Sequence, residues 1–120
     1  MPTTSPNYDL IQTWLDPSPR RTFTATGYIT SGVNDGKFRR LCPHVLGYKK
    51  PGSPHEIPAN ERVLCWQLVG PGTNPQWRCY KVKDLVGVAV DTATPWLMGI
   101  DYSKHQNCTK VEKFKVPFPP

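Results

Sequence analysis

The sequence predicts a mainly β fold, in which one short N-terminal helix precedes a small barrel or rolled sheet. The chain has 120 residues, the length of one domain with a single modest core. Its 14 prolines and 9 glycines divide it into short segments that leave little room for long helices. About five or six of these segments have the spacing or composition of strands. A closed sheet would hide strand edges that otherwise favour aggregation.

An amphipathic helix is expected in residues 5–16. Pro6 suits the first position of a helix, and Pro17 ends the pattern because proline has no N–H to donate. The apolar residues that recur there at helical spacing are Leu10, Ile11, Trp14 and Leu15.

A hairpin is expected next. Residues 21–30 alternate apolar side chains with threonines, which is typical of a half-buried strand. The NDG sequence at 34–36 supplies the turn, because Asp and Gly tolerate positive φ. Residues 37–42 form the returning strand. Pro43 removes a backbone donor, so a loop or bulge is expected to begin there.

The middle of the chain predicts a loop and then a meander. Residues 49–60 contain three prolines and a glycine, and we expect a mobile surface loop. Apolar runs at 62–69, 76–82 and 85–90 follow, the first two separated by GPGTNP. Three successive strands of this kind predict a meander.

After residue 90 the strand pattern weakens. Residues 91–95 are turn-like, 96–100 fit a short strand, and 116–120 form a proline-rich end. The domain organisation expected from the whole pattern is an N-terminal extension at 1–9, a β-barrel domain at 10–90, and a C-terminal tail at 91–120 that packs on or extends the barrel.

Charge and cysteine content bear on location and partners. No run approaches the roughly 20 apolar residues of a membrane span, and the N-terminus lacks a signal core, so we expect a cytoplasmic protein with no membrane contact. Four cysteines without CxxC spacing then predict reduced thiols rather than disulfides or a zinc site. The net charge of +6 favours polyanions as partners.

Three segments carry motifs of a known domain family. Residues 35–48, DGKFRRLCPHVLGY, are similar to a stretch in which a turn glycine precedes R-x-V-E-P-H-x-L-G. Residues 63–67, VLCWQ, resemble a strand that ends in an aromatic and Gln, and residues 77–85, WRCYKVKDL, resemble a W-R-x-F-R-L-D-R-I strand. Together these segments resemble the WYL domain family. The sequence departs from the family in lacking the Trp-Tyr-Leu tripeptide, in Cys42 where Glu is usual, and in the order Lys83-Asp84.

The resemblance spans roughly residues 10–90 and implies an Sm-like, SH3-type barrel. In bacterial regulators such a domain usually follows a DNA-binding winged helix and senses nucleic acid or nucleotide-like ligands. A chain of 120 residues has no room for that winged helix, so the resemblance implies a stand-alone domain.

Basic and aromatic residues on the predicted strands suggest a site for phosphate and bases. Guanidinium and ammonium groups bind phosphate, and aromatic faces stack on bases. The candidate ligand-binding residues are Arg39, His44, Tyr48, Trp66, Gln67, Arg78, Tyr80 and Lys81. Trp77 lies among them.

Structural roles compete with each of these assignments. Strand cations are often only the solvated face of a sheet, and about half of the aromatics are expected to fill the core. Arg78 and Lys81 point to opposite sides of one strand unless a bulge intervenes. His44 could donate to a phosphate or make a purely structural hydrogen bond.

The predicted function is a ligand-sensing or regulatory module for a phosphate-bearing ligand, either single-stranded nucleic acid or a nucleotide. The alternative is a protein interaction module, such as a homodimer or an accessory subunit of a regulator or effector complex. No catalytic set has a recognisable spacing, so neither an enzyme nor a cofactor is expected. A metal or thiol site at Cys42 and His44 would need further ligands to converge.

Overall fold

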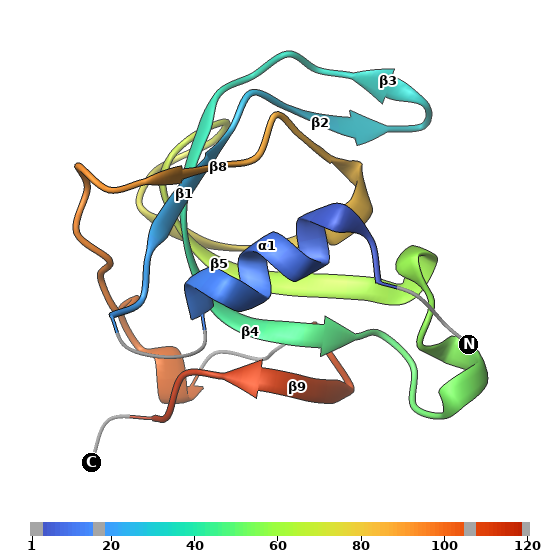
Figure 1. Cartoon of the computed structure of the whole chain (residues 1–120). Coiled ribbons are helices and arrows are strands. Elements are labelled where there is room, and N and C mark those ends of the chain that lie inside the picture. The colour runs from blue at the N-terminus through green and yellow to red at the C-terminus, as the bar shows by residue number, and fades with distance from the viewer. Residues whose placement is uncertain (1–3, 16–18, 105–107, 119–120) are drawn as a thin grey trace.

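The computed structural model describes residues 4–15, 19–104 and 108–118 (Figure 1). Their helices and strands, in chain order, are α1 (Pro6–Leu15), β1 (Thr22–Ala25), β2 (Gly27–Thr30), β3 (Val33–Asn34), β4 (Arg39–Tyr48), β5 (Glu61–Val69), β6 (Gln76–Lys81), β7 (Leu85–Val86), β8 (Ala89–Asp91) and β9 (Val111–Lys115). The prediction of a mainly β fold with one short helix is confirmed. That helix begins inside the stretch 1–9 that the sequence assigns to an extension.

The strands form two antiparallel sheets. The larger has the order β6-β5-β4-β1-β8, and β9 also pairs with β4. The smaller has the order β3-β2-β7. β4 is the centre of the fold, because one of its edges pairs with β5 while the other pairs first with β1 and then with β9. The pairs among the described strands do not form a closed ring, so the barrel stays a prediction.

Pro43 does not end its strand. β4 continues through it to Tyr48, and the pairing with β5 shifts between Pro43 and Val45, which marks the predicted bulge but not a loop. A bulge leaves one residue without a cross-strand partner and re-aims side chains. Here that residue is His44, whose carbonyl accepts a hydrogen bond from the Val116 amide at 2.8 Å.

The predicted hairpin turn at 34–36 is wrong. The turn between β2 and β3 is Ser31-Gly32, where both residues have positive φ, as a two-residue hairpin loop of this hand requires. Asn34 already pairs with Ile29. The strand predicted at 21–30 is accordingly divided into β1 and β2, which belong to different sheets.

The prediction of a meander is only partly correct. β4, β5 and β6 form one, but the run predicted as a strand at 85–90 divides into β7 and β8. These pair with β2 and β1 rather than with β6. Gly87, at φ 64°, separates them and redirects the chain. Residues 49–60 lie at the surface as predicted and contain two short 3₁₀ turns.

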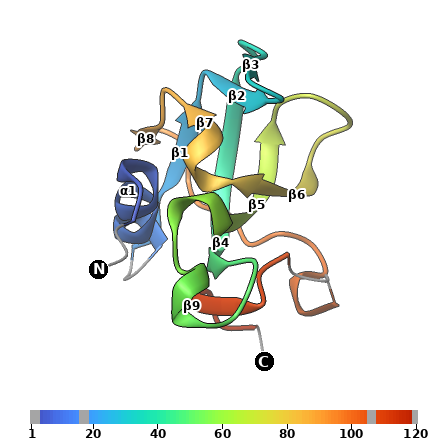
Figure 2. The same ribbon diagram turned by 90° about the vertical axis from the view of Figure 1, so that its right-hand side faces the viewer.

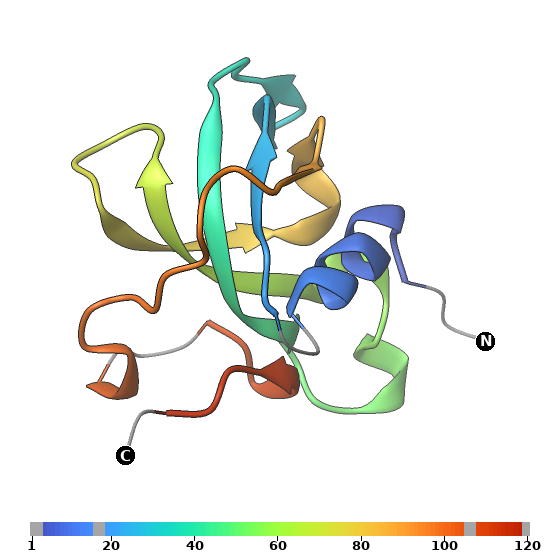
Figure 3. The same cartoon turned by 60° about the vertical axis from the view of Figure 1, so that its left-hand side comes forward.

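The C-terminal segment differs most from expectation. No strand forms at 96–100, and β9 was not predicted. After β8 the chain crosses the face of the large sheet opposite α1, as Figures 2 and 3 show. We call residues 92–104 and 108–118 the tail. Within the described residues no helix has the length and apolar character needed to cross a bilayer.

Each face of the large sheet is covered by a different layer. On one face α1 packs Tyr8 against Tyr48 and Trp14 against Phe23, with ring centroids 5.7 and 5.5 Å apart. On the other face the tail contributes Trp96, Gly99, Tyr102 and Val116. Successive side chains of β5 point to opposite faces of the sheet. Because both faces are covered, all its residues from 61 to 67 are buried.

Two of the four cysteines form a disulfide, so the prediction of four reduced thiols is wrong. Cys79 on β6 is bonded to Cys108 in the tail, while Cys42 and Cys65 are free and buried. Spacing along the chain did not indicate this pair, because only the path of the tail brings them together. Burial raises the pKa of the Cys42 and Cys65 thiols, which keeps them protonated.

Removing the disulfide should destabilise the protein by about 3 to 4 kcal/mol, the chain-entropy value for a closed loop of this length. The two cysteines are 29 residues apart. Urea unfolding of Cys79→Ser/Cys108→Ser measures the loss. A dithiol reductant should lower wild-type stability to that of the variant and leave the variant unchanged. Equal stability of oxidised wild type and variant would contradict the prediction.

Candidate ligand-binding site

Arg39 lies inside the protein rather than on a ligand-facing surface. It is 3% exposed, and its Nη2 donates to Asp35 Oδ2 at 2.7 Å. Its Nε donates to the Tyr80 hydroxyl at 3.1 Å, and its guanidinium lies over the Tyr28 and Tyr80 rings. Hydrogen bonds from Arg39 and from the Lys37 amide hold the pKa of Asp35 well below its usual range. The contacts of Arg39 are therefore structural.

Tyr80 and Gln67 continue this buried network. The Tyr80 hydroxyl donates to Gln67 Oε1, and Gln67 Nε2 donates to Pro71 O at 3.0 Å and to Asn74 Oδ1 at 2.9 Å. Both residues are almost completely buried. The network ties the loop between β5 and β6 to the sheet, so neither polar group is left for a ligand.

His44 is fully buried, and both ring nitrogens are occupied. Nδ1–H donates to the Cys42 carbonyl at 2.9 Å, and Nε2 accepts from the Gly99 amide at 3.0 Å. A carbonyl only accepts and an amide only donates, so this pair of contacts requires the neutral ring. Burial lowers the pKa of His44 to about 4, opposed by the hydrogen bond to Cys42.

The two remaining aromatic candidates differ in position. Tyr48 belongs to the core and stacks on Tyr8 under α1. Trp66 is 8% exposed and lies on the opposite face, tilted against Trp77 at 5.0 Å. Trp77 also stacks on Tyr102 and donates from Nε1 to the Ile100 carbonyl at 2.8 Å.

Arg78 and Lys81 are the candidates that reach solvent. Both are exposed on β6, an edge strand of the large sheet. Their side chains make no hydrogen bond or ion pair with any of the residues that the structure describes. These two cations remain free to meet an anion.

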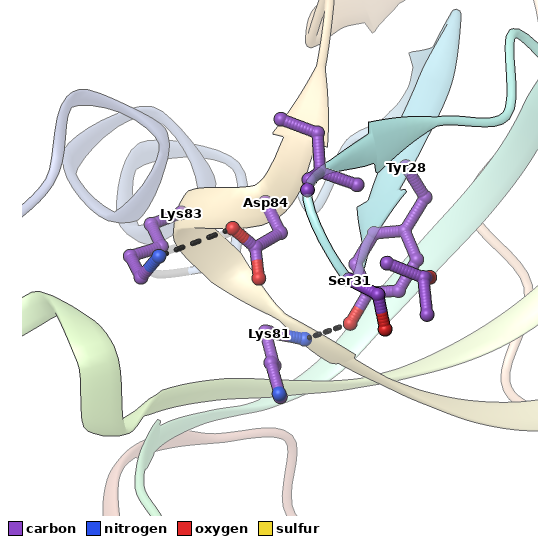
Figure 4. Close-up of a pocket in the computed structure, with 8 residues that line it drawn as sticks. Tyr28, Ser31, Lys81, Lys83 and Asp84 are labelled. Carbon is purple, nitrogen blue, oxygen red and sulfur yellow. Dashed lines mark hydrogen bonds and ion pairs between the residues drawn. The ribbon is translucent and has the colours of Figure 1, made fainter.

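A pocket of about 380 Å³ lies at the C-terminal end of β6 (Figure 4). We call it the lysine pocket. One wall is the β2–β3 turn, and the other is the end of β6 with the 3₁₀ turn Val82–Asp84. It is lined by Tyr28, Ile29, Thr30, Ser31, Gly32, Lys81, Lys83 and Asp84.

Two contacts hold the lysine pocket in shape. The Tyr28 hydroxyl accepts a hydrogen bond from the Lys81 amide at 2.8 Å, which joins the hairpin to β6. Lys83 Nζ lies 3.2 Å from Asp84 Oδ1. The Lys83 side chain is 45% exposed, so this ion pair is weak and exchangeable. Lys81 is left as the cation without an acidic partner in the described structure.

A second pocket, of about 360 Å³, lies at the N-terminal end of β6. We call it the tryptophan pocket. It combines the apolar surfaces of two indoles with amide, carboxylate and ammonium groups from β6 and the tail. Its lining residues are Trp66, Gln76, Trp77, Ile100, Asp101 and Lys104.

Sequence reasoning therefore found only part of each pocket. It named Lys81 and Trp66, but it missed Tyr28, Ser31 and Asp101, which come from distant segments. The Ser31-Gly32 dipeptide is a turn signal that could have placed the hairpin end correctly. Nothing in the tail sequence marks Asp101 as a partner of β6.

The described residues contain no group of three or more His, Cys, Asp or Glu side chains that could hold a metal ion. Cys42 and His44, considered as ligands from the sequence, are both buried and already hydrogen-bonded to neighbours.

Comparison of the chain with protein-family models, curated proteins and solved structures finds no match. The resemblance to WYL domains therefore remains a prediction from the sequence motifs.

Replacing Arg39 with alanine should lower stability far more than replacing Arg78. Arg39→Ala removes a buried cation and its hydrogen bonds, so it should lower the free energy of unfolding by on the order of 3 kcal/mol. Arg78→Ala removes an exposed side chain, so the change should stay within about 0.5 kcal/mol. Urea unfolding of both variants measures the difference, and equal losses would contradict these roles.

Stability should fall as the pH drops from about 6.5 towards about 4, because the unfolded chain then protonates His44 while the folded protein does not. The contribution reaches roughly 3 kcal/mol for a shift of this size. Burial raises the pKa of Glu61, which opposes the trend, so the slope is compared with that of His44→Gln.

An NMR titration of the wild-type His44 ring tests the same point without a variant. The ring should stay neutral down to pH values near 4. Protonation with a midpoint at the ordinary value of about 6.5 would show that the Gly99 contact does not form.

Proposed function

We propose that this protein is a binding module for a phosphate-bearing ligand and that the ligand lies along β6. The observation that carries the proposal is the lysine pocket, where Lys81 has no acidic partner among the described residues. Ammonium groups bind phosphate as point charges. The Thr30 and Ser31 hydroxyls on the opposite wall can donate to phosphate oxygens.

Single-stranded nucleic acid is the ligand class that this surface fits best. Arg78 and Lys81 follow the exposed edge strand, and the tryptophan pocket lies at its other end. Single strands are bound by a positive groove that follows the backbone and by aromatic faces that take bases. The net charge of +6 supports steering of such a ligand.

The proposal includes a non-enzymatic sensing or regulatory role of the WYL type. The family-like motifs supply β4, β5 and β6, three neighbouring strands of the larger sheet. In this proposal the two described sheets are an Sm-like barrel that is rolled but open. Disulfides persist mainly in oxidising compartments, so the Cys79–Cys108 bond weighs against the cytoplasmic location expected from the sequence.

A protein interaction module is the second candidate. β6 is an edge strand, and an edge strand can pair with an extended peptide. The tail also exposes three apolar residues, of which Ile100 lines the tryptophan pocket and the other two, Leu97 and Met98, do not. Binding of this kind depends on main-chain pairing and apolar contact, so it would be much less sensitive to salt.

Fluorescence anisotropy with labelled single-stranded oligonucleotides, at about 50 and 200 mM salt, tests the proposal. Wild type should bind, and the affinity should fall steeply with salt. Lys81→Ala and Lys83→Ala should each weaken binding and reduce the salt slope by roughly 0.7 to 1, the value for one lost phosphate contact.

Lys50→Ala is the matched control, because it removes the same charge from an exposed residue that lines neither pocket. It should leave the slope nearly unchanged. Absence of binding at low salt, or equal effects of Lys50→Ala and Lys81→Ala, would overturn the nucleic-acid proposal.

A further inference from the structure

The tryptophan pocket has a shape and a set of polar groups that the lysine pocket lacks. We propose that it receives one base of the bound strand and selects guanine. This inference rests on the proposed function and adds a specificity to it. It is carried by the indoles, by the fixed wall of the pocket, and by two opposite charges on one turn.

Parts of the two indoles, together with Ile100, supply an apolar contact for a planar base. Trp66 and Trp77 are cross-strand partners on β5 and β6, and their ring centroids lie 5.0 Å apart. Ile100, 66% exposed, borders the same pocket. Trp66 is 8% exposed and Trp77 stacks on Tyr102, so a base contacts only the parts of the indoles that line the pocket, and this apolar contact does not depend on which base it is. Selectivity must therefore come from polar neighbours.

The wall that the tail forms against the indoles is held in place by several contacts. The Gly99 amide donates to His44, and Trp77 Nε1 donates to the Ile100 carbonyl. A Cβ at position 99 would lie 2.3 Å from Trp77, so only glycine lets the backbone approach this closely. The disulfide from Cys79 to Cys108 fixes the end of the same segment. A pre-formed wall reduces the cost of ordering on binding.

Asp101 and Lys104 provide the selective groups. They flank one turn, whose backbone is closed by the Lys104 amide donating to the Asp101 carbonyl at 3.0 Å. Neither side chain makes an ion pair with the other or with the rest of the described chain. The pocket thus offers an acceptor pair and a cation that have no ion-pair partner among the described residues.

Guanine matches this combination better than the other bases. Its N1–H and N2–H₂ groups are adjacent donors, which suit the two oxygens of one carboxylate. Its O6 and N7 are adjacent acceptors, which suit an ammonium such as Lys104. Adenine, cytosine and thymine lack the two adjacent donors, so they would leave a carboxylate oxygen of Asp101 without a hydrogen bond.

The two pockets also set a minimum length for the ligand. Lys81 lies four positions after Trp77 on β6, which corresponds to about 13 Å along the strand. A stacked strand advances about 3.4 Å per nucleotide, so a ligand that reaches both pockets contains roughly four nucleotides. The inferred ligand is a short single strand with guanine at the tryptophan pocket, not a mononucleotide.

The test compares three labelled single strands of equal length: oligo-dT, oligo-dT with one central dG, and the same strand with inosine, which lacks the N2 amino group. Wild type should bind the dG strand about 5- to 150-fold more tightly than oligo-dT, the range for one bidentate base contact. Inosine should lose much of that gain.

Asp101→Asn is the diagnostic variant. Asp101 has φ 58°, and asparagine tolerates this conformation well, so the turn should persist. The variant should lose the preference for guanine and keep the affinity for oligo-dT. Asp9→Asn on α1 makes the same charge change elsewhere and should keep the preference.

The outcomes separate this inference from the proposed function. Lys81-dependent binding of all three strands with equal affinity would overturn guanine selection alone. A guanine preference that survives Asp101→Asn would also overturn it. Absence of binding to any strand would overturn both proposals.

Discussion

The hydrogen bond from the Gly99 amide to neutral His44 determines where the tail lies. Because Pro43 breaks regular pairing, β4 bulges at His44, and the ring meets Trp77, Trp96 and Tyr102. A protonated ring would direct a second N–H at the Gly99 amide, so the contact requires the neutral form. The tail docked in this way supplies one wall of the tryptophan pocket and brings Cys108 to Cys79.

Polar residues that resemble ligand-binding groups are used here to build the scaffold. In a domain of this size a buried cation must be satisfied internally, and Arg39 is satisfied by Asp35, Lys37 and Tyr80. Among the described residues that line the two pockets, Lys81, Asp101 and Lys104 have no ion-pair partner, and they lie near the two ends of β6. Ligand binding is therefore expected where the edge strand leaves the sheet, not at its centre.

Local patterns predicted the elements whose contacts are local or strongly periodic. The helical spacing of Ile11, Trp14 and Leu15 predicted α1, and continuous apolar runs predicted β5 and β6. β9 has alternating lysines and no apolar run, so it is a strand only because β4 offers it a free edge. The turn likewise forms at Ser31-Gly32 and not at residues 34–36, because Thr30 pairs with Val33 and Ile29 with Asn34.

Of the residues that line the two pockets, the sequence indicated only some of those that lie on β5 and β6. Lys81 and Trp66 belong to those strands and were identified. Tyr28 and Asp101 come from the hairpin and the tail, which approach β6 over more than 20 residues of sequence, and no spacing rule connects them. The disulfide was missed for the same reason.

The most direct test of β6 as the ligand surface is an NMR titration of the isotope-labelled protein with a short single strand that contains one dG. The account predicts that the perturbed amides cluster at residues 30–32, 76–84 and 99–104, with residues 50–56 and 111–115 unaffected. Perturbations centred on residues 50–56 or 111–115, or none at low salt, would contradict it.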